Sequence, residues 1–195
     1  EGEVLIEKLT EVKAKLYTLA SHASELESAN DLLENELPDL LSFRADILRN
    51  AQILNSLTEF IKSSKPKHLA LLFQNPSEIR PGGGFIGSFA ILTIQEGNLT
   101  NTEVTDIYDP DGQLDLKVIP PEPLQKITKA WEARDANWFF HFPDSAKKVA
   151  FFLNNSKIYQ ERGITFDGVI AINTTVFEDI LATIGEVTLE EYGLT

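Results

Sequence analysis

The sequence contains no cysteine and no methionine among its 195 residues. Without cysteine the chain can form no disulfide, no thiolate metal site and no thiol nucleophile. Its three histidines, His22, His68 and His141, are far apart in the sequence and give little support to a zinc site. No apolar run approaches the roughly 20 residues that cross a bilayer, and no signal-peptide pattern is present. Because the first residue is Glu1, we expect a piece of a longer protein whose membrane anchor lies in a missing segment.

Basic residues are also few. The chain has 17 Lys and Arg against 30 Asp and Glu, which gives a formal charge of 17 − 30 = −13. Such a surface repels phosphate backbones, so we expect no nucleic-acid partner, and an anionic ligand would need a local basic pocket. Hydrophobic residues make up 43% of the chain, which excludes a disordered polymer and suffices for one core with an accessory element.

Glycine is absent between Val4 and Lys62, and proline occurs there once, at Pro38. The apolar residues of this region recur at steps of four and three, which predicts two long helices with coiled-coil seams, the second beginning near Pro38. We expect residues 1–64 to form a helical hairpin, a stalk or lid in which each seam buries the other. The first seam comprises Leu5, Leu9, Val12, Leu16, Leu19, Ala23 and Leu26; the second comprises Leu33, Leu37, Leu40, Ile47, Ala51, Leu54 and Ile61.

Composition changes after the polar stretch 63–67, so we expect a second domain over residues 67–195. Its pattern predicts a mixed α/β layered domain. An apolar strand covered on both faces, a hairpin turning at Gly97, a turn at 109–112 and a second buried strand are expected. The predicted strands are 68–74, 85–95, 99–108, 166–172 and a start at 187–189; the predicted helices are 124–131, 143–154 and one from Asn173 to Gly185 with a Thr175/Glu178 capping box.

The loop 75–84 is the first candidate site. It ends in Gly82, Gly83 and Gly84 and also carries Glu78 and Arg80. Three ordered glycines are costly, so we expect positive φ angles or the close approach of another group to the backbone. A glycine-rich loop can bind an anion with its amides while an arginine grips a phosphate. The alternative is a tight loop in which Arg80 pairs with a carboxylate.

Two further clusters of polar residues are candidates. The segment 134–144 combines Arg134, Asp135 and Asn137 with aromatic rings, which is typical of a concave site but also of a loop whose aromatics fill the core. A group of aspartates could bind Mg²⁺ or Ca²⁺, or could form a solvated acidic turn. Those aspartates are Asp106, Asp109, Asp111 and Asp115.

Three segments together resemble the domain of unknown function 4012 family. They are NPSEIRPGGGFIGS at 75–88, RDANW at 134–138 with FPDSA at 142–146, and DGVIAI at 167–172. The resemblance covers about residues 68 to 192. It implies a bacterial envelope protein, anchored by an amino-terminal membrane helix, with this domain on the extracytoplasmic face of the cell membrane.

The order of elements is also distantly similar to the LytR-CpsA-Psr family, which binds polyprenyl-pyrophosphate lipids and transfers glycopolymers to peptidoglycan with Mg²⁺. This similarity implies a LytR-CpsA-Psr-like α/β fold after the helical hairpin. The chain departs from that family at two places. The stretch 84–88 lacks the expected carboxylate, and 106–111 lacks the expected arginine.

The resemblance implies a domain that binds, and could transfer, a polyprenyl-pyrophosphate-linked or cell-wall glycan phosphate; as an enzyme it would be a glycopolymer phosphotransferase. Arg80 and Arg134 would hold the pyrophosphate, and Asp135 would hold a cation together with Asp109. Arg80, Arg134 and Asp135 would be the catalytic residues. Asp106, Asp109 and Asp111 would hold Mg²⁺. The expected ligand-binding residues are Asn75, Glu78, Gly82, Gly83, Gly84, Asn137 and Trp138.

The alternative function is a non-catalytic envelope scaffold or adhesion module in which the same arginines form internal ion pairs. The two functions differ in whether Arg80 and Arg134 face one open cavity. Because the chain stops soon after the last predicted strand, we also expect that a partner element could lie beyond its C-terminus.

Overall fold

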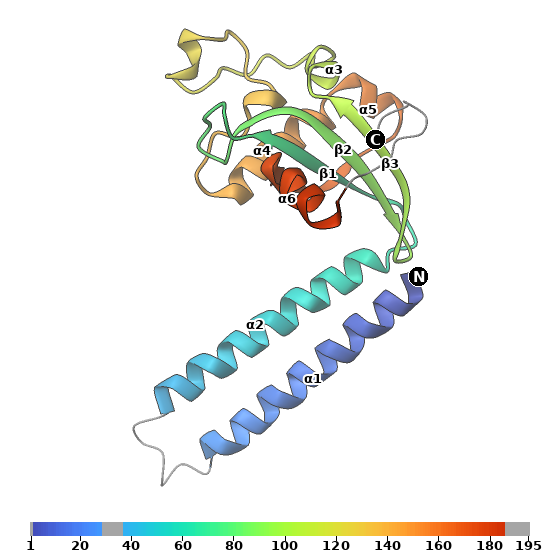
Figure 1. The fold of residues 1–195 in the computed structure, drawn as a ribbon, viewed down its shortest axis with the longest axis vertical. Coiled ribbons are helices and arrows are strands. Elements are labelled where there is room, and N and C mark those ends of the chain that lie inside the picture. Colours follow the sequence, from blue (N-terminus) through green and yellow to red (C-terminus); the bar gives the residue numbers. More distant parts are fainter. Residues whose placement is uncertain (1, 29–36, 186–195) are drawn as a thin grey trace. The chain divides into compact units, whose positions relative to one another are not determined.

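The computed structural model describes residues 2–28 and 37–185 (Figure 1). The chain divides into two compact units. One comprises Glu1–Lys67 with Ile94–Thr100, and the other comprises His68–Thr93 with Asn101–Thr195. The prediction assigned all of residues 67–195 to the second domain. In the structure the hairpin turn around Gly97 belongs instead to the same unit as the helices.

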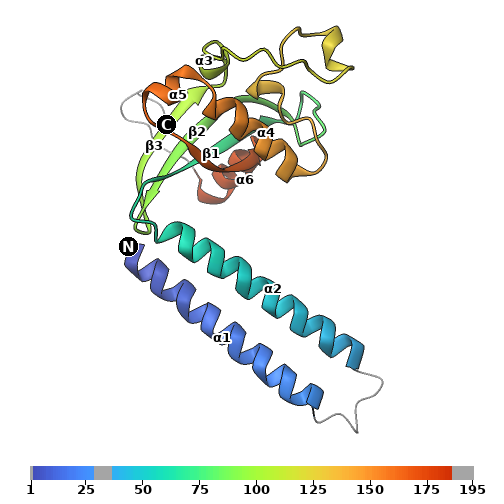
Figure 2. The same ribbon diagram turned by 180° about the vertical axis from the view of Figure 1, so that it is seen from behind.

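The first unit is built on two long antiparallel helices, α1 (Gly2–Ser28) and α2 (Leu37–Ile61), which lie side by side in both ribbon views (Figures 1 and 2). Small side chains allow the helices to approach closely, since Ala20, Ala23 and Ala51 are buried. The Lys13 ammonium donates a hydrogen bond to Asn55 Oδ1 at 3.0 Å across the pair. The predicted helical hairpin is therefore present.

The predicted burial of the first seam is wrong for four of its seven residues. Leu9 and Leu16 are half-buried and Ala23 is buried. The other four seam residues are between 44% and 54% exposed, because the apolar stripe of α1 is two rows wide and α2 covers one flank of it. These exposed residues are Leu5, Val12, Leu19 and Leu26.

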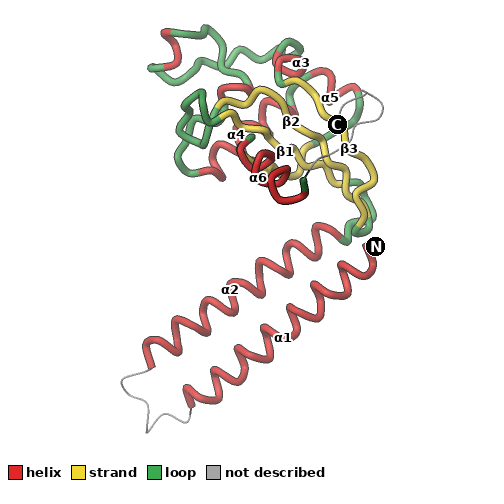
Figure 3. Tube along the Cα trace, viewed as in Figure 1, coloured by secondary structure: helices red, strands yellow, loops and turns green. Residues whose placement is uncertain are grey.

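The second unit contains most of a four-stranded mixed sheet, drawn in yellow in Figure 3. The sheet order is β3-β2-β1-β4, and β1 pairs with β4 in parallel, with Leu71 opposite Ile170. The turn between β2 and β3 has positive φ at Glu96 (49°) and Gly97 (80°), as a two-residue hairpin turn requires. The strands are β1 (Lys67–Asn75), β2 (Phe85–Gln95), β3 (Asn98–Asp106) and β4 (Phe166–Asn173).

Two helices lie on opposite faces of the sheet, α4 (Phe142–Asn154) and α6 (Thr175–Ile184) (Figures 1 and 2). The core lies on the α4 side, where the rings of Phe89, Tyr159 and Phe166 pack edge to face with centroids 5.0 to 6.3 Å apart. On the other side α6 has no buried residue, and the ring of Phe177 packs against that of Phe73 with centroids 5.4 Å apart. The mixed α/β fold behind a helical hairpin is confirmed.

Several local predictions differ from the structure. The turn at 109–112 is a single helical turn, α3 (Tyr108–Asp111), and the helix predicted at 124–131 is reduced to the 3₁₀ turn η2 (Leu124–Lys126). The predicted capping box is wrong, because the N-cap of α6 is Thr174 and no side chain makes a capping hydrogen bond there. The end of that helix at Gly185, which has a φ of 83°, is as predicted. The turn η3 (Ala133–Asp135) and α5 (Lys157–Glu161) were not predicted. The strand start at 187–189 lies outside the described residues.

Burial of the first strand also differs from the prediction. Along β1 fully buried and half-buried positions alternate, with Ala70 and Leu72 among the buried ones. The strand was expected to be covered on both faces. The alternation arises because α4 and the core seal one face, whereas α6 covers the other only in part.

Replacing Phe89 by alanine should lower the free energy of unfolding by about 3–5 kcal/mol, since its ring is fully buried against two other aromatic rings. Phe140→Ala is the matched control, because that ring is 91% exposed and its loss should change stability by less than about 0.5 kcal/mol. Urea denaturation followed by circular dichroism measures both. Equal effects of the two substitutions would contradict the assigned core.

Candidate functional site

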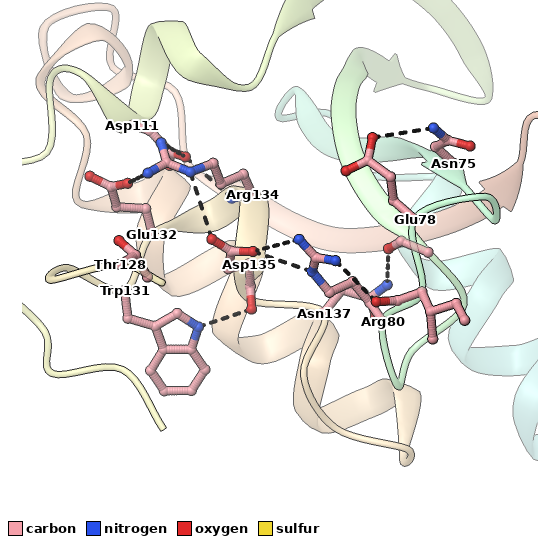
Figure 4. A network of polar contacts seen from close by, with 12 residues as sticks. Asn75, Glu78, Arg80, Asp111, Thr128, Trp131, Glu132, Arg134, Asp135 and Asn137 are labelled. Atoms are coloured by element: carbon pink, nitrogen blue, oxygen red, sulfur yellow. Dashed lines mark hydrogen bonds and ion pairs between the residues drawn. The ribbon is translucent and has the colours of Figure 1, made fainter. Parts of the chain in front are cut away.

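The first two candidate segments meet in the structure (Figure 4). The loop between β1 and β2 lies against the chain that runs through η3 to Asn137. The backbone N–H of Gly82 donates to the carbonyl of Asn137 at 3.3 Å, and the side-chain amide of Asn137 donates to the carbonyl of Gly84 at 2.8 Å. These bonds link residues more than fifty positions apart in the sequence.

The close approach of Asn137 explains why the loop needs glycine. A Cβ atom on Gly82 would lie 1.6 Å from Asn137 Oδ1, so no other residue fits there without moving that side chain. Gly83 and Gly84 adopt φ of 114° and 140°, which side chains with a Cβ rarely adopt. Both expectations for the loop are thus met, but the group that approaches its backbone is Asn137 of the same chain.

Arg80 points out of this loop toward η3. Its Nε and Nη2 atoms both lie 3.3 Å from Asp135 Oδ1, and Nη1 donates to the carbonyl of Ile79 at 3.0 Å. The guanidinium also lies 5.2 Å from the ring centroid of Phe85. Because the Arg80 side chain is 24% exposed and that of Asp135 only 9%, this is a largely buried ion pair.

Arg134 binds the same carboxylate from the other side. Its Nε atom lies 3.7 Å from Asp135 Oδ2, its Nη1 lies 3.6 Å from Asp111 Oδ2, and its Nη2 forms an ion pair with Glu132. We call Arg80, Asp111, Glu132, Arg134 and Asp135 the charge network. Two cations face three carboxylates, so the network carries 2 − 3 = −1 when all are ionised.

Asp111 holds η3 in place. Its carboxylate is almost fully buried and accepts hydrogen bonds from the backbone N–H groups of Ala133 at 2.8 Å and Arg134 at 3.3 Å. Desolvation raises the pKa of Asp111 from 3.8 to about 6, although those hydrogen bonds act in the opposite direction. Asp111 thus accepts hydrogen bonds that hold the backbone of η3, and its raised pKa lies closer to neutral pH than that of an exposed aspartate.

A cavity of about 300 Å³ opens beside Arg80. Among its lining residues Arg80 carries the only charge, and Arg134 does not line it. The two arginines therefore share Asp135, and of the two only Arg80 lines this cavity. The lining residues are Ile79, Arg80, Pro81, Pro123, Leu124, Ile127 and Trp138.

The predicted metal-binding aspartates do not converge. Asp106 Oδ1 accepts from the backbone N–H of Tyr108 at 2.8 Å, Asp109 Oδ2 accepts from the Thr105 hydroxyl at 3.4 Å, and Asp111 belongs to the charge network. Within residues 2–28 and 37–185 no group of three or more His, Asp or Glu side chains is arranged to hold a metal ion. Asp106, Asp109 and Asp111 therefore do not form one set of ligands, and no step through a metal follows from them.

Asn75 and Glu78 stabilise the loop itself. Asn75 Oδ1 accepts from the backbone N–H of Ser77 at 3.1 Å, and Asn75 Nδ2 lies 3.4 Å from Glu78 Oε1. The carbonyl of Glu78 accepts from the N–H of Phe85 at 3.0 Å. Neither side chain is among the residues that line the cavity.

Sequence reasoning missed two members of the site. Glu132 forms an ion pair with Arg134. The indole N–H of Trp131 donates a hydrogen bond to the carbonyl of Asp135 at 3.0 Å. Both residues lie just before the recognised segment 134–144. A carboxylate two positions before an arginine is a usable signal for the first. No local pattern identifies the second.

Gly82→Ala should lower the free energy of unfolding by about 1–3 kcal/mol, because the new Cβ displaces Asn137 and breaks its bond to Gly84. Gly87→Ala on β2 is the control, since a Cβ there meets only a Phe85 ring atom at 4.0 Å. Thermal melting of both variants measures the difference. An unchanged melting temperature for Gly82→Ala would refute the close approach of Asn137.

The raised pKa of Asp111 makes its contribution to stability depend on pH. Between about pH 4 and about pH 6 the folded protein holds the proton and the unfolded chain has released it, so raising the pH through this window lowers stability. We expect the free energy of unfolding of the wild type, relative to Asp111→Asn, to decrease over that range and then level off. Urea denaturation at a series of pH values measures it; a difference that increases with pH would contradict the assignment.

A model of the family described as "Protein of unknown function (DUF4012)" matches residues 64–195. No curated protein and no solved structure matches the chain. In the described residues no helix is both long enough and apolar enough to cross a bilayer.

Proposed function

The chain belongs to the DUF4012 family, whose description gives no function, so we propose a function from the site. We propose that the protein is a non-catalytic scaffold or adhesion module on the extracytoplasmic face of the bacterial cell membrane. The location rests on the resemblance to envelope proteins described above. The non-catalytic role rests on one observation. Both arginines that would bind a ligand are paired with carboxylates of the same chain, and they share Asp135.

Electrostatics favours this proposal over phosphate binding by the charge network. A phosphate reaching Arg134 would have to displace Asp111 or Glu132, and the displaced carboxylate would remain largely buried without its partner. The network is itself −1 when ionised, and the chain carries −13. Local and global charge therefore both oppose an added anion. The ion pairs of the charge network hold η3, α3 and the glycine loop together.

A second candidate function is supported by the cavity beside Arg80. Apart from Arg80 its lining is apolar, and its volume of about 300 Å³ is at the lower end of the range for ligand pockets. A lipid-linked phosphate, a polyprenyl phosphate or a glycan carried on one, could place part of its chain against Trp138 and its head group at the exposed edge of Arg80. In this function Arg134 and the three aspartates take no part in binding.

The two functions predict different behaviour of arginine variants. If the arginines are structural, Arg80→Ala and Arg134→Ala should each lower the free energy of unfolding by about 1–3 kcal/mol, because a charged hydrogen-bonded partner of a buried carboxylate is lost. Arg162→Ala is the control, since its pair with Glu103 is about 40% exposed and is worth at most about 1 kcal/mol. Melting curves of the three variants measure these losses.

Calorimetric titration of the same proteins with a soluble prenyl pyrophosphate, with and without Mg²⁺, completes the test. The scaffold proposal expects no wild-type binding at about millimolar ligand. Binding abolished by Arg80→Ala and retained by Arg134→Ala would overturn it in favour of the cavity function. Binding that needs both arginines and Mg²⁺ would instead support the lipid-phosphate transfer implied by the distant family resemblance.

A further inference from the structure

Four large apolar side chains are almost fully exposed, and they lie close to one another in the α/β unit. They are 78% to 91% exposed, whereas the next large apolar side chain among the described residues, Val104, is 65% exposed. Two of the four line the cavity beside Arg80, and the other two lie within four residues of positions that line it. This grouping differs from the scattered exposure that is ordinary on protein surfaces. The four are Ile79, Ile119, Ile127 and Phe140.

Two of these side chains belong to the segment 119–130, which we call the proline excursion. A bridge closes its base, where the N–H of Trp131 donates to the carbonyl of Val118 at 2.8 Å. The excursion, yellow in both ribbon views, projects from the body of the α/β unit (Figures 1 and 2). Leu124 is buried and anchors it, whereas Ile127 is 84% exposed.

The backbone of the excursion is restricted. It contains Pro120, Pro121 and Pro123, whose rings fix their φ angles. The side-chain amide of Gln125 donates to the carbonyl of Pro120 at 2.8 Å, and the N–H of Leu124 donates to that of Pro121 at 2.9 Å. A segment held in this way loses little conformational entropy when a surface covers its exposed side chains.

The excursion and the glycine loop present one apolar edge. Ile79 of the loop and Ile127 of the excursion line the same cavity and are 88% and 84% exposed, so they stand at its mouth. We call these two residues the isoleucine rim. Trp138 lines the same cavity and is half-buried. Two protruding side chains beside a hollow suit a medium that can flow around them, as lipid acyl chains do.

The rim lies in a locally basic part of an acidic chain. The stretch 116–131 carries Lys117, Lys126 and Lys129 against Glu122, so its charge is 3 − 1 = +2, whereas the chain carries −13. Glu78, the exposed carboxylate next to Ile79, leaves +1 when it is included. The lysines nearest to Ile127 are both exposed, and neither forms an ion pair with a described residue.

The carboxylates that bracket this basic stretch are already paired. Asp115 forms an ion pair with Lys157 at 2.8 Å, and Glu132 forms one with Arg134. They therefore do not cancel the lysines of the excursion. Basic side chains beside an exposed apolar tip are the combination that binds a bilayer of anionic lipids, because the head groups attract the ammonium groups while the acyl region takes up the apolar side chain.

We propose that the isoleucine rim inserts into the surface of a bilayer that contains anionic lipid, with Lys126 and Lys129 against the lipid head groups. A stable protein interface buries about 800 Å² on each partner, more than two narrow tips offer, whereas a lipid surface needs no complementary shape. The proposal goes beyond the scaffold function and does not rest on it, because it depends only on the excursion and the glycine loop.

The first test is co-sedimentation of the 195-residue chain with vesicles of phosphatidylcholine, alone or with about 30% phosphatidylglycerol. We expect binding to the anionic vesicles to be tighter by about tenfold or more and to weaken as salt is raised. Trp138 fluorescence should shift to shorter wavelength on binding, since Trp138 lines the cavity at the rim. Trp131 is 7% exposed and should contribute a constant signal.

The second test removes the rim. Ile79→Ser with Ile127→Ser should weaken vesicle binding by about tenfold or more, because both apolar side chains would be lost from the bilayer. Leu99→Ser with Val104→Ser is the matched control, since these residues of β3 are 60% and 65% exposed and do not line the cavity. The control should bind as the wild type does. Circular dichroism checks that each variant keeps its fold.

The third test separates local charge from total charge. Lys126→Glu with Lys129→Glu should remove the preference for phosphatidylglycerol. Lys8→Glu with Lys15→Glu on α1 changes the total charge by the same amount and should keep that preference.

Several outcomes would overturn the proposal. One is a wild type that does not bind anionic vesicles, or that binds neutral ones as tightly. Another is equal weakening by both serine pairs, or by both glutamate pairs, because general hydrophobicity or total charge would then account for binding. A third is binding that Arg80→Ala abolishes and the Lys126 and Lys129 variant retains, which would place a lipid head group in the cavity instead. The scaffold proposal is tested by melting and by prenyl pyrophosphate titration, so the two can fail separately.

Discussion

The carboxylate of Asp135 lies between two guanidinium groups, and the architecture of the α/β unit around the glycine loop depends on this one contact. Arg80 comes from the β1–β2 loop, whereas Arg134 comes from η3 and reaches on to Asp111 of α3. Three segments that the sequence separates are therefore joined through η3, whose Asp135 binds Arg80 of the loop and whose Arg134 binds Asp111 of α3. Each pair is largely buried, so it is stable only while every partner is present. The glycine loop, the 3₁₀ turn and the single turn of α3 consequently stabilise one another.

This constraint also explains why the unusual local sequences need not mark a reaction. The three glycines allow Asn137 to approach the loop backbone. Asp111 accepts hydrogen bonds from two backbone N–H groups that would otherwise be buried without an acceptor. Trp131 and Trp138 belong to the same region, but one closes the core and the other lines a cavity. The remaining exposed feature of the site is thus apolar surface beside a single guanidinium.

Patterns local to the chain predicted much of the fold. The apolar run of β1, the turn at Gly97 and the helical periodicity of α4 each depend on neighbours within about a dozen residues. The pairing of Arg80 with Asp135 spans 55 residues, and composition alone does not tell a guanidinium that faces a ligand from one that faces a carboxylate. The predicted burial of the α1 seam was wrong for a related reason. A repeat of 3.5 residues shows that a stripe is apolar but not how many helices cover it.

The parallel pairing of β1 with β4 has a consequence for how the chain acquires its structure. β1 is an inner strand of the sheet, yet one of its two neighbours lies almost a hundred residues later, with His68 opposite Phe166. Closing so long a loop costs entropy before any contact repays it, so sheet completion is expected to be a late and slow folding event. During synthesis the edge of β1 has no partner until β4 has been made. Throughout that interval a nascent chain exposes an apolar strand edge, and protection from aggregation becomes a requirement of its biogenesis.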